Sequence, residues 1–259
     1  MSIVVGRVVG SPSRAEAVDN NLDWNIRGGY ASGLGNNGNV NPSNQLSGYV
    51  GYTPASMAYA VATQEMCTLQ YSTLAGWLSE RGYKSSRIVT NVNENSNCFE
   101  HGNAIFWRGG CVNVGDCDPM GHFGTQGGES DLRGFVCAVA GTGVGTARCS
   151  THLSNNSDRT VAQNQSYEYY VQMYNRAAAG GAVVAMGDFN LNPTQFPSWS
   201  PYFVEGDPWN YPTHPTGGKI DRQLYSYPFC VISYNPPSIY DNPFSDHHVY
   251  RAWKNPSPC

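Results

Sequence analysis

Residues 182–193 read AVVAMGDFNLNP, a short apolar run that ends at Asp188 and is followed closely by Asn190. A run of this length and composition predicts a buried strand. Functional side chains in α/β proteins gather at the carboxyl ends of strands, which makes Asp188 and Asn190 candidates for a site. Asp and Asn also favour ordinary turns, so this stretch alone leaves both interpretations open.

Six other stretches repeat this arrangement of polar residues at or just after an apolar run. They are WNIR at 24–27, TQEM at 63–66, HGNAIFWR at 101–108, STHLS at 150–154, KIDRQL at 219–224 and SDHH at 245–248. Taken singly, Glu65 suits a solvated strand edge, His152 a structural histidine and Asp221 a surface ion pair. Two histidines that follow an acid within one turn, as in 245–248, are harder to explain without a function.

The rest of the chain alternates between strand-like and helical patterns. Strand-like runs occupy residues 22–26, 59–65, 103–107, 133–140, 145–153, 182–188, 223–226 and 249–253, and helical patterns fit residues 66–81 and 157–179. A hairpin around GTGVG at 141–145 interrupts the alternation, so we predict a mixed sheet flanked by helices. No internal repeat or linker-like run divides the sequence, and we expect one domain over residues 1–259.

The composition excludes some classes of protein. Of the 259 residues, 40% are hydrophobic and only 13% are charged, which is typical of a globular, loop-rich chain. The formal net charge is −4. The chain therefore has no overall positive field, which argues against a passive nucleic-acid-binding module. An enzyme that holds phosphate through bound cations and a few arginines remains compatible with this charge.

Eight cysteines are scattered along the chain without the close pairs of a zinc site. We therefore expect disulfides, and two pairings suggest themselves: Cys111 with Cys117 across a short loop, and Cys137 with Cys149 across the hairpin. Disulfides imply an oxidising compartment.

The sequence holds no apolar stretch long enough to span a bilayer, and the start MSIVVGRVVG lacks the apolar core of a signal peptide. We expect a secreted protein in its mature form, without its signal peptide and with a start methionine added for expression.

Together, the polar stretches supply the groups that phosphodiester hydrolysis requires: carboxylate oxygens for Mg²⁺, Mn²⁺ or Ca²⁺, amides for phosphate oxygens, and histidines for proton transfer. Glu65 is the obvious carboxylate ligand. Zinc would favour clusters of His and Cys, which the sequence does not show.

In order and spacing, the motifs QE, GNA, THL, GDFN, IDR and SDHH resemble those of the endonuclease/exonuclease/phosphatase superfamily, to which deoxyribonuclease I belongs. The resemblance runs from about Leu22 to Val249. It implies an α/β fold of the deoxyribonuclease I type, a four-layer αβ-sandwich in which two packed mixed sheets are flanked by helices. It also implies a divalent cofactor, Mg²⁺ or Mn²⁺, with Ca²⁺ as a possible structural or activating ion.

The resemblance assigns roles to particular residues. It implies metal ligands at Asn25 and Glu65, with Asp246 on the metal side, and a phosphate contact and candidate general acid at His152. It further implies that Asp188 and Asn190 orient water and phosphate, that Asp221 supports the leaving group or a second metal, and that His247 deprotonates water. We expect Asp246 to fix the tautomer of its neighbour His247 and raise its basicity. Which histidine is the acid and which the base stays open.

Four further residues are candidates for contact with substrate. Asn103 lies in the GNA motif, and Arg133 either touches phosphate or pairs with an acidic neighbour. Arg27 either binds a nucleic-acid backbone or is solvated. His248 is expected to contact the residues that bind substrate. Glu100 and His101 leave open which acid, if any, polarises His152.

Three functions compete. A monomeric deoxyribonuclease I-like endonuclease with DNA as substrate is favoured by compact size and secretion. A sphingomyelinase-type phospholipid phosphodiesterase or a small-molecule phosphatase would use the same residues, and the aromatic segment 196–212 would suit membrane contact, base stacking or simple packing on the body. A catalytically silent binding protein is disfavoured, because each catalytic position holds a competent residue.

Overall fold

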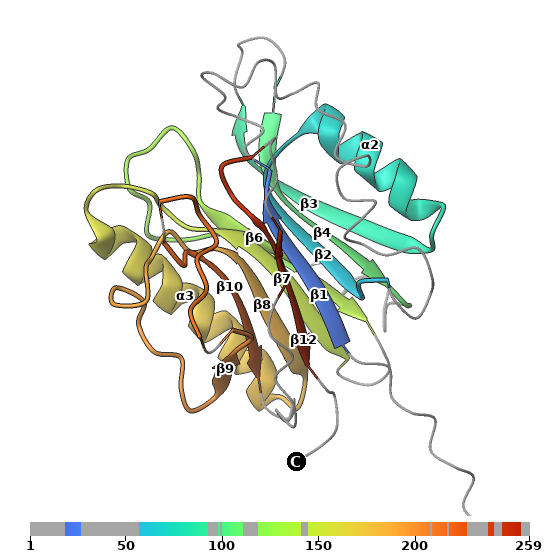
Figure 1. Ribbon diagram of the computed structural model, residues 1–259. Coiled ribbons are helices and arrows are strands. Elements are labelled where there is room, and N and C mark those ends of the chain that lie inside the picture. Colours follow the sequence, from blue (N-terminus) through green and yellow to red (C-terminus); the bar gives the residue numbers. More distant parts are fainter. Residues whose placement is uncertain are drawn as a thin grey trace, which may run out of the picture.

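The computed structural model describes residues 19–26, 57–92, 98, 100–110, 119–140, 145–207, 209–216, 218–226, 238–240 and 245–254. These residues form two six-stranded sheets, each with one helix packed on its outer face (Figure 1). Arg27 and the predicted pairing of Cys111 with Cys117 lie outside the described residues.

Both sheets are mixed. The first has the order β11 (Ser238–Tyr240), β12 (Val249–Lys254), β1 (Asp19–Asn25), β2 (Ala60–Cys67), β4 (Glu100–Arg108) and β3 (Tyr83–Val92). The second has the order β5 (Met120–His122), β6 (Gly134–Ala140), β7 (Thr146–His152), β8 (Ala182–Asp188), β10 (Asp221–Ser226) and β9 (Phe203–Glu205). In each sheet one central pair is parallel, β1 with β2 and β7 with β8, and the other pairs are antiparallel.

Three apolar cores hold four layers together. Leu74 and Leu78 of α2 (Thr68–Ser79) pack on the first sheet, and Tyr169 and Met173 of α3 (Arg159–Ala178) pack on the second. Between the sheets lies a third core of small and branched residues together with Trp107 and Tyr225. Each large apolar side chain buried in this way contributes about 1.5 to 3 kcal/mol to stability. The expected four-layer αβ-sandwich is confirmed.

The predicted strands and helices correspond to observed ones, with shifts at their ends. The prediction missed β3, β5, β9 and β11. In β3, which reads YKSSRIVTNV, polar residues dominate the first half, so no apolar run marks it. As an edge strand it pairs on one side only, with β4, and hydrogen bonding rather than hydrophobic patterning defines it.

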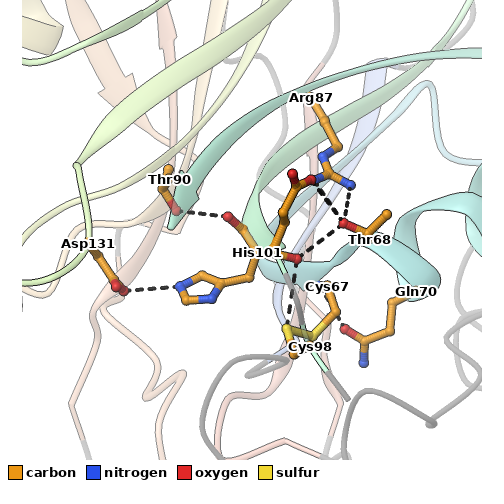
Figure 2. The surroundings of a disulfide bond; sticks show 9 residues. Cys67, Thr68, Gln70, Arg87, Thr90, Cys98, His101 and Asp131 are labelled. Atoms are coloured by element: carbon orange, nitrogen blue, oxygen red, sulfur yellow. Dashed lines mark hydrogen bonds and ion pairs between the residues drawn. A yellow bond between two sulfur atoms is a disulfide. The ribbon is translucent and has the colours of Figure 1, made fainter. Parts of the chain in front are cut away.

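Two disulfides lie in the described residues. Cys137–Cys149 joins directly opposed residues of β6 and β7, which confirms the predicted pairing. Cys67–Cys98 was not predicted; it ties the last residue of β2 to the chain just before β4 (Figure 2). The sequence separation of this pair, 31 residues, gives no local signal of the contact.

The aromatic segment 196–212 divides into two parts. Trp199 and Phe203 are buried and pack on Tyr169 and its neighbours, as simple packing on the body requires. Trp209 and Tyr211 are 50% and 45% exposed. Neither helix among the described residues has the length and apolar character that crossing a membrane requires.

Candidate active site

Strand register brings the predicted polar residues to one end of the sandwich. In the second sheet His152 lies opposite Asp188, and Asp188 lies opposite Asp221. In the first sheet Asn25, the last residue of β1, lies beside the end of β2. These ends open on a cavity of about 1070 Å³.

A buried polar network joins the two sheets at this end. Gln64 Nε2 donates to Asp23 Oδ1 (2.8 Å) and to Ser150 Oγ (3.0 Å), and the backbone N–H of Gly187 donates to Asp23 Oδ2 (3.1 Å). Buried polar groups of this kind are stable only when they are hydrogen-bonded, so the network fixes the relative position of the two sheets.

An irregularity in β2 presents Glu65 to the cavity. The pairing of β2 with β4 shifts register between Thr63 and Met66, and Glu65 has a φ of 54°, in the left-handed region that non-glycine residues rarely adopt. Asn25 Nδ2 donates to Glu65 Oε1 (3.2 Å) and to Asp188 Oδ2 (3.0 Å). Strain of this kind is typical of a functional position.

Backbone positions with positive φ also occur at the end of β8. Gly187 has a φ of 142°, and a Cβ there would lie 2.1 Å from the carbonyl oxygen of Thr151, so only glycine fits. Asn190, with a φ of 51°, donates its backbone N–H to Asp188 Oδ1 (2.8 Å) and its side-chain amide to the carbonyl of Leu153 (3.0 Å). Asp188 is thus held with Oδ2 turned toward Asn25.

His247 lies between two carboxylates. Its Nδ1 is 3.0 Å from Asp221 Oδ2, and its Nε2 is 3.6 Å from Asp188 Oδ2. Burial alone lowers the pKa of His247, but Asp221 and then Asp188 outweigh burial and raise this pKa to about 10. The prediction that Asp246 fixes the tautomer is wrong, because Asp221 faces Nδ1 of His247. Asp246 does add to the rise of this pKa, as predicted.

His152 has the opposite surroundings. Its Nε2 is 3.5 Å from Asp188 Oδ2 and 3.7 Å from Glu65 Oε1, whereas its Nδ1 is 2.9 Å from Arg133 Nη1. Arg133 is held in turn by Glu129, with Nε and Oε2 2.8 Å apart. Burial and the charge of Arg133 lower the pKa of His152 well below its usual value. Arg133 therefore contacts both an acid and a catalytic candidate, and no carboxylate of the described residues polarises Nδ1.

Negative charge accumulates at this end of the sheets. Burial raises the pKa of Asp23 well above its ordinary value, and the charges of Asp221 and Asp188 add to this. Burial also raises the pKa of Asp188 to about 7; His247 opposes this rise and Asp221 adds to it. Glu65 and Asp188, which share the amide of Asn25, offer the hard oxygen atoms that Mg²⁺, Mn²⁺ and Ca²⁺ bind. The donor set and the surplus negative charge both fit a divalent cation.

Asp246 belongs to a second group, which sequence analysis did not foresee. Its Oδ2 is 3.6 Å from Nε2 of His214, and the ring of His214 meets that of His247 with centroids 5.0 Å apart. His214 comes from the segment between β9 and β10, and no motif marks it. The sequence did not reveal this group because the fold assembles it from segments that are distant in the chain.

Several predicted substrate contacts need correction. Asn103 is only 1% exposed and donates to the carbonyl of Gly134 (3.0 Å), so it ties β4 to β6 and does not contact substrate. Among the described residues, the cavity lining includes His247 but not His248, whose backbone N–H donates to Thr213.

Glu100 and His101 have partners of their own. Glu100 pairs with Arg87, and Nε2 of His101 is 3.1 Å from Asp131 Oδ2 (Figure 2). Neither pair polarises His152, which settles the ambiguity left by the sequence. The pair His101–Asp131 instead ties the start of β4 to the segment that carries Glu129 and Arg133.

A family model described as the Endonuclease/Exonuclease/phosphatase family matches residues 24–247. The chain belongs to this family, whose members hydrolyse phosphoester bonds and commonly use divalent metals. No curated protein matches the chain.

Solved structures share the fold at low sequence identity. The human Nocturnin catalytic domain with bound sulfate has a TM-score of 0.68 and 15% identity, covering 92% of this chain and 94% of that one. Truncated TDP2 from Caenorhabditis elegans has a TM-score of 0.64 and 17% identity, covering 92% and 97%. A mannosyl-6-phosphatase from Bacteroides thetaiotaomicron has a TM-score of 0.59 and 15% identity, covering 90% and 97%. The fold is therefore of the deoxyribonuclease I type.

Proposed function

We propose that this protein is a divalent-metal-dependent phosphodiesterase that hydrolyses nucleic acid, with DNA as the favoured substrate. One observation carries the proposal. Two histidines face the same oxygen of Asp188 at 3.5 and 3.6 Å, and that carboxylate shares the amide of Asn25 with Glu65. The set combines cation ligands and proton carriers in one cavity, as phosphodiester hydrolysis requires.

Each residue has a role in this scheme. Glu65, Asp188 and Asn25 would hold the cation, which would offset the negative charge that develops on the phosphate. In the pair Asp188–His247, the carboxylate of Asp188 takes the proton of the attacking water, because His247 is already an imidazolium. Asp221 at Nδ1 stabilises that imidazolium. His152 is neutral, because Arg133 Nη1 can only donate to its Nδ1. Its Nε2–H therefore donates a hydrogen bond to a phosphate oxygen.

The walls of the cavity favour a hydrophilic substrate. Arg133 and Arg159 line it, together with the amide side chains of Asn155, Asn192, Gln195 and Asn210. Guanidinium groups bind phosphate oxygens, and amides hydrogen-bond to sugars and bases. The exposed rings of Trp209 and Tyr211 favour a second candidate, a phospholipid phosphodiesterase, since they could enter a lipid surface.

The two disulfides support the further proposal that the protein is secreted into an oxidising compartment. We also propose that it works as a single-domain monomer.

The decisive test is conversion of supercoiled plasmid by the purified protein in Mg²⁺ or Mn²⁺, with and without Ca²⁺, beside a sphingomyelin assay. We expect nicking that disappears with EDTA and with His247→Ala. His122→Ala, a change to an exposed histidine on β5, is the matched control and should nick normally.

Intact plasmid together with sphingomyelin hydrolysis would show that the substrate is a membrane phospholipid rather than nucleic acid. A protein that hydrolyses no phosphodiester in any of these metals would contradict the proposal as a whole.

A further inference from the structure

We propose that His214, Asp246 and His247 form a second metal site, selective for a transition-metal ion such as Zn²⁺, and that occupation of this site inhibits the enzyme. The metal site stands on its own geometry, whereas the inhibition rests on the proposed function. One ligand atom from each residue lies within 4.8 Å of the other two.

The three side chains reach the cavity from different parts of the chain. All three line it, and their side chains are 21%, 29% and 8% exposed. Nε2 of His214 lies 3.6 Å from Asp246 Oδ2, and the two imidazole rings meet edge to face at 74°. An ion can therefore enter from solvent without a rearrangement of the fold.

Each of the two histidines has a group beside its Nδ1 that can accept a hydrogen bond, as a metal-ligating histidine requires. A ligating histidine usually donates its second ring N–H to a nearby acceptor, which orients the ring. His247 Nδ1 faces Asp221 at 3.0 Å, and His214 Nδ1 faces the hydroxyl of Thr216 at 2.8 Å. Asp221 and Thr216 thus orient the two rings, and Nε2 of His214 lies toward Asp246.

Ion binding requires simple proton changes. The backbone N–H of Thr216 also points at His214 Nδ1 (3.3 Å), which places the proton of the metal-free ring on Nε2. On binding, this proton moves to Nδ1, where the Thr216 hydroxyl accepts a hydrogen bond from it. The Nε2 proton of His247 is released to solvent, as metal binding to histidine requires.

Donor chemistry separates this site from the one at Glu65. Two imidazole nitrogens and one carboxylate suit Zn²⁺, Co²⁺ or Ni²⁺, whereas Glu65, Asn25 and Asp188 offer hard oxygen ligands suited to Mg²⁺. An ion at the second site takes the lone pair of His247 Nε2, the atom that faces Asp188 at 3.6 Å. Proton transfer through the pair Asp188–His247 then stops.

The test measures binding directly. Tag-free, metal-stripped protein is titrated with Co²⁺, followed by its visible absorption, and with Zn²⁺ by calorimetry. We expect one site that millimolar Mg²⁺ does not compete for. Thr216→Val keeps all three ligands and should weaken Zn²⁺ binding by about 10-fold or more, and His214→Gln should weaken it further. His122→Gln and Glu65→Gln should bind normally.

Activity provides the second readout. At fixed Mg²⁺, the Zn²⁺ concentration that halves plasmid nicking should rise at least about 10-fold in His214→Gln, relative to the rate of that variant without Zn²⁺. Equal Zn²⁺ binding by wild type and His214→Gln would overturn the site, and binding without inhibition would overturn its inhibitory role. Binding through His214 in a protein that cleaves no phosphodiester would refute the proposed function alone.

Discussion

His152 and His247 lie on either side of Asp188, with ring nitrogens 3.5 and 3.6 Å from the same carboxylate oxygen, yet their surroundings drive their pKa values in opposite directions. The difference arises at the far nitrogen of each ring. His247 Nδ1 meets the carboxylate of Asp221, and His152 Nδ1 meets the guanidinium of Arg133.

The comparison shows that one carboxylate can face two histidines in different charge states. In this protein, the residue that faces the far nitrogen of each ring decides which ring carries a second proton. Exchanging or removing Asp221 and Arg133 should therefore bring the pKa values of the two histidines closer together.

The largest expected effect is that of Asp221→Asn. An amide cannot stabilise the imidazolium of His247, so we expect the turnover number to fall by about 10² to 10⁴ and the pKa of His247 to fall from about 10. NMR titration of the ring and plasmid nicking measure the two effects. Asp221→Asn combined with His247→Ala should be little worse than His247→Ala alone, and additive losses would argue that the two residues act separately.

The second largest expected effect is that of Arg133→Met on His152. Arg133→Met removes the positive charge beside His152 Nδ1, so the pKa of His152 should rise toward its ordinary value and the turnover number should fall by about 10- to 100-fold. Arg159→Met is the matched control, because Arg159 also lines the cavity. If both variants lost activity equally while the pKa of His152 stayed low, Arg133 would act through substrate rather than through the ring.

The smallest effect is on stability and concerns the shared carboxylate. The folded protein holds the Asp188 proton more tightly than the unfolded chain does, so the cost of ionising it grows as pH rises from 3.8 to about 7 and is complete above that. Asp188→Asn should therefore stabilise the metal-free protein at pH 8 by about 1 to 3 kcal/mol, measured by thermal unfolding in EDTA. It should have little effect at pH 4.

The pKa of Asp131 is shifted in the opposite direction to that of Asp188. Burial alone would raise the pKa of Asp131, but its hydrogen bond and ion pair with His101 outweigh burial and lower this pKa. Its stabilising contribution is present above 3.8 and is lost as pH falls through the lowered pKa. Asp131→Asn should destabilise the protein at pH 8, opposite in sign to Asp188→Asn.

The strands that carry Asn25, Glu65, His152 and Asp188 could be predicted from the sequence, because buried central strands leave apolar runs that end at polar residues. The edge strand β3 could not, since polar residues, Ser86 and Thr90, occupy two of its buried positions. The disulfide Cys137–Cys149 could be predicted because its cysteines flank a predicted hairpin. Cys67–Cys98 could not, because it depends on the path of the chain between β3 and β4.

Within the site, the residues grouped around Asp188 were foreseen, but the partners that set their charge states were not. Sequence adjacency suggested that Asp246 serves His247, but strand register places Asp221 there instead. Glu129 and His214 carry no motif, and only the folded arrangement brings them to Arg133 and His247. The role of Asn103 was misjudged because a polar residue at a strand end can also bridge two sheets.

The distribution of the site over both sheets has a consequence for folding. Asn25 and Asp188 are 163 residues apart in the chain, and Gln64 meets Ser150 across a separation of 86. Contacts of such range form late, because the entropy of closing long loops opposes them. Either sheet formed alone would hold only part of the reaction centre. Recovery of hydrolysis during refolding should therefore report the docking of the two sheets, after most of the secondary structure has returned.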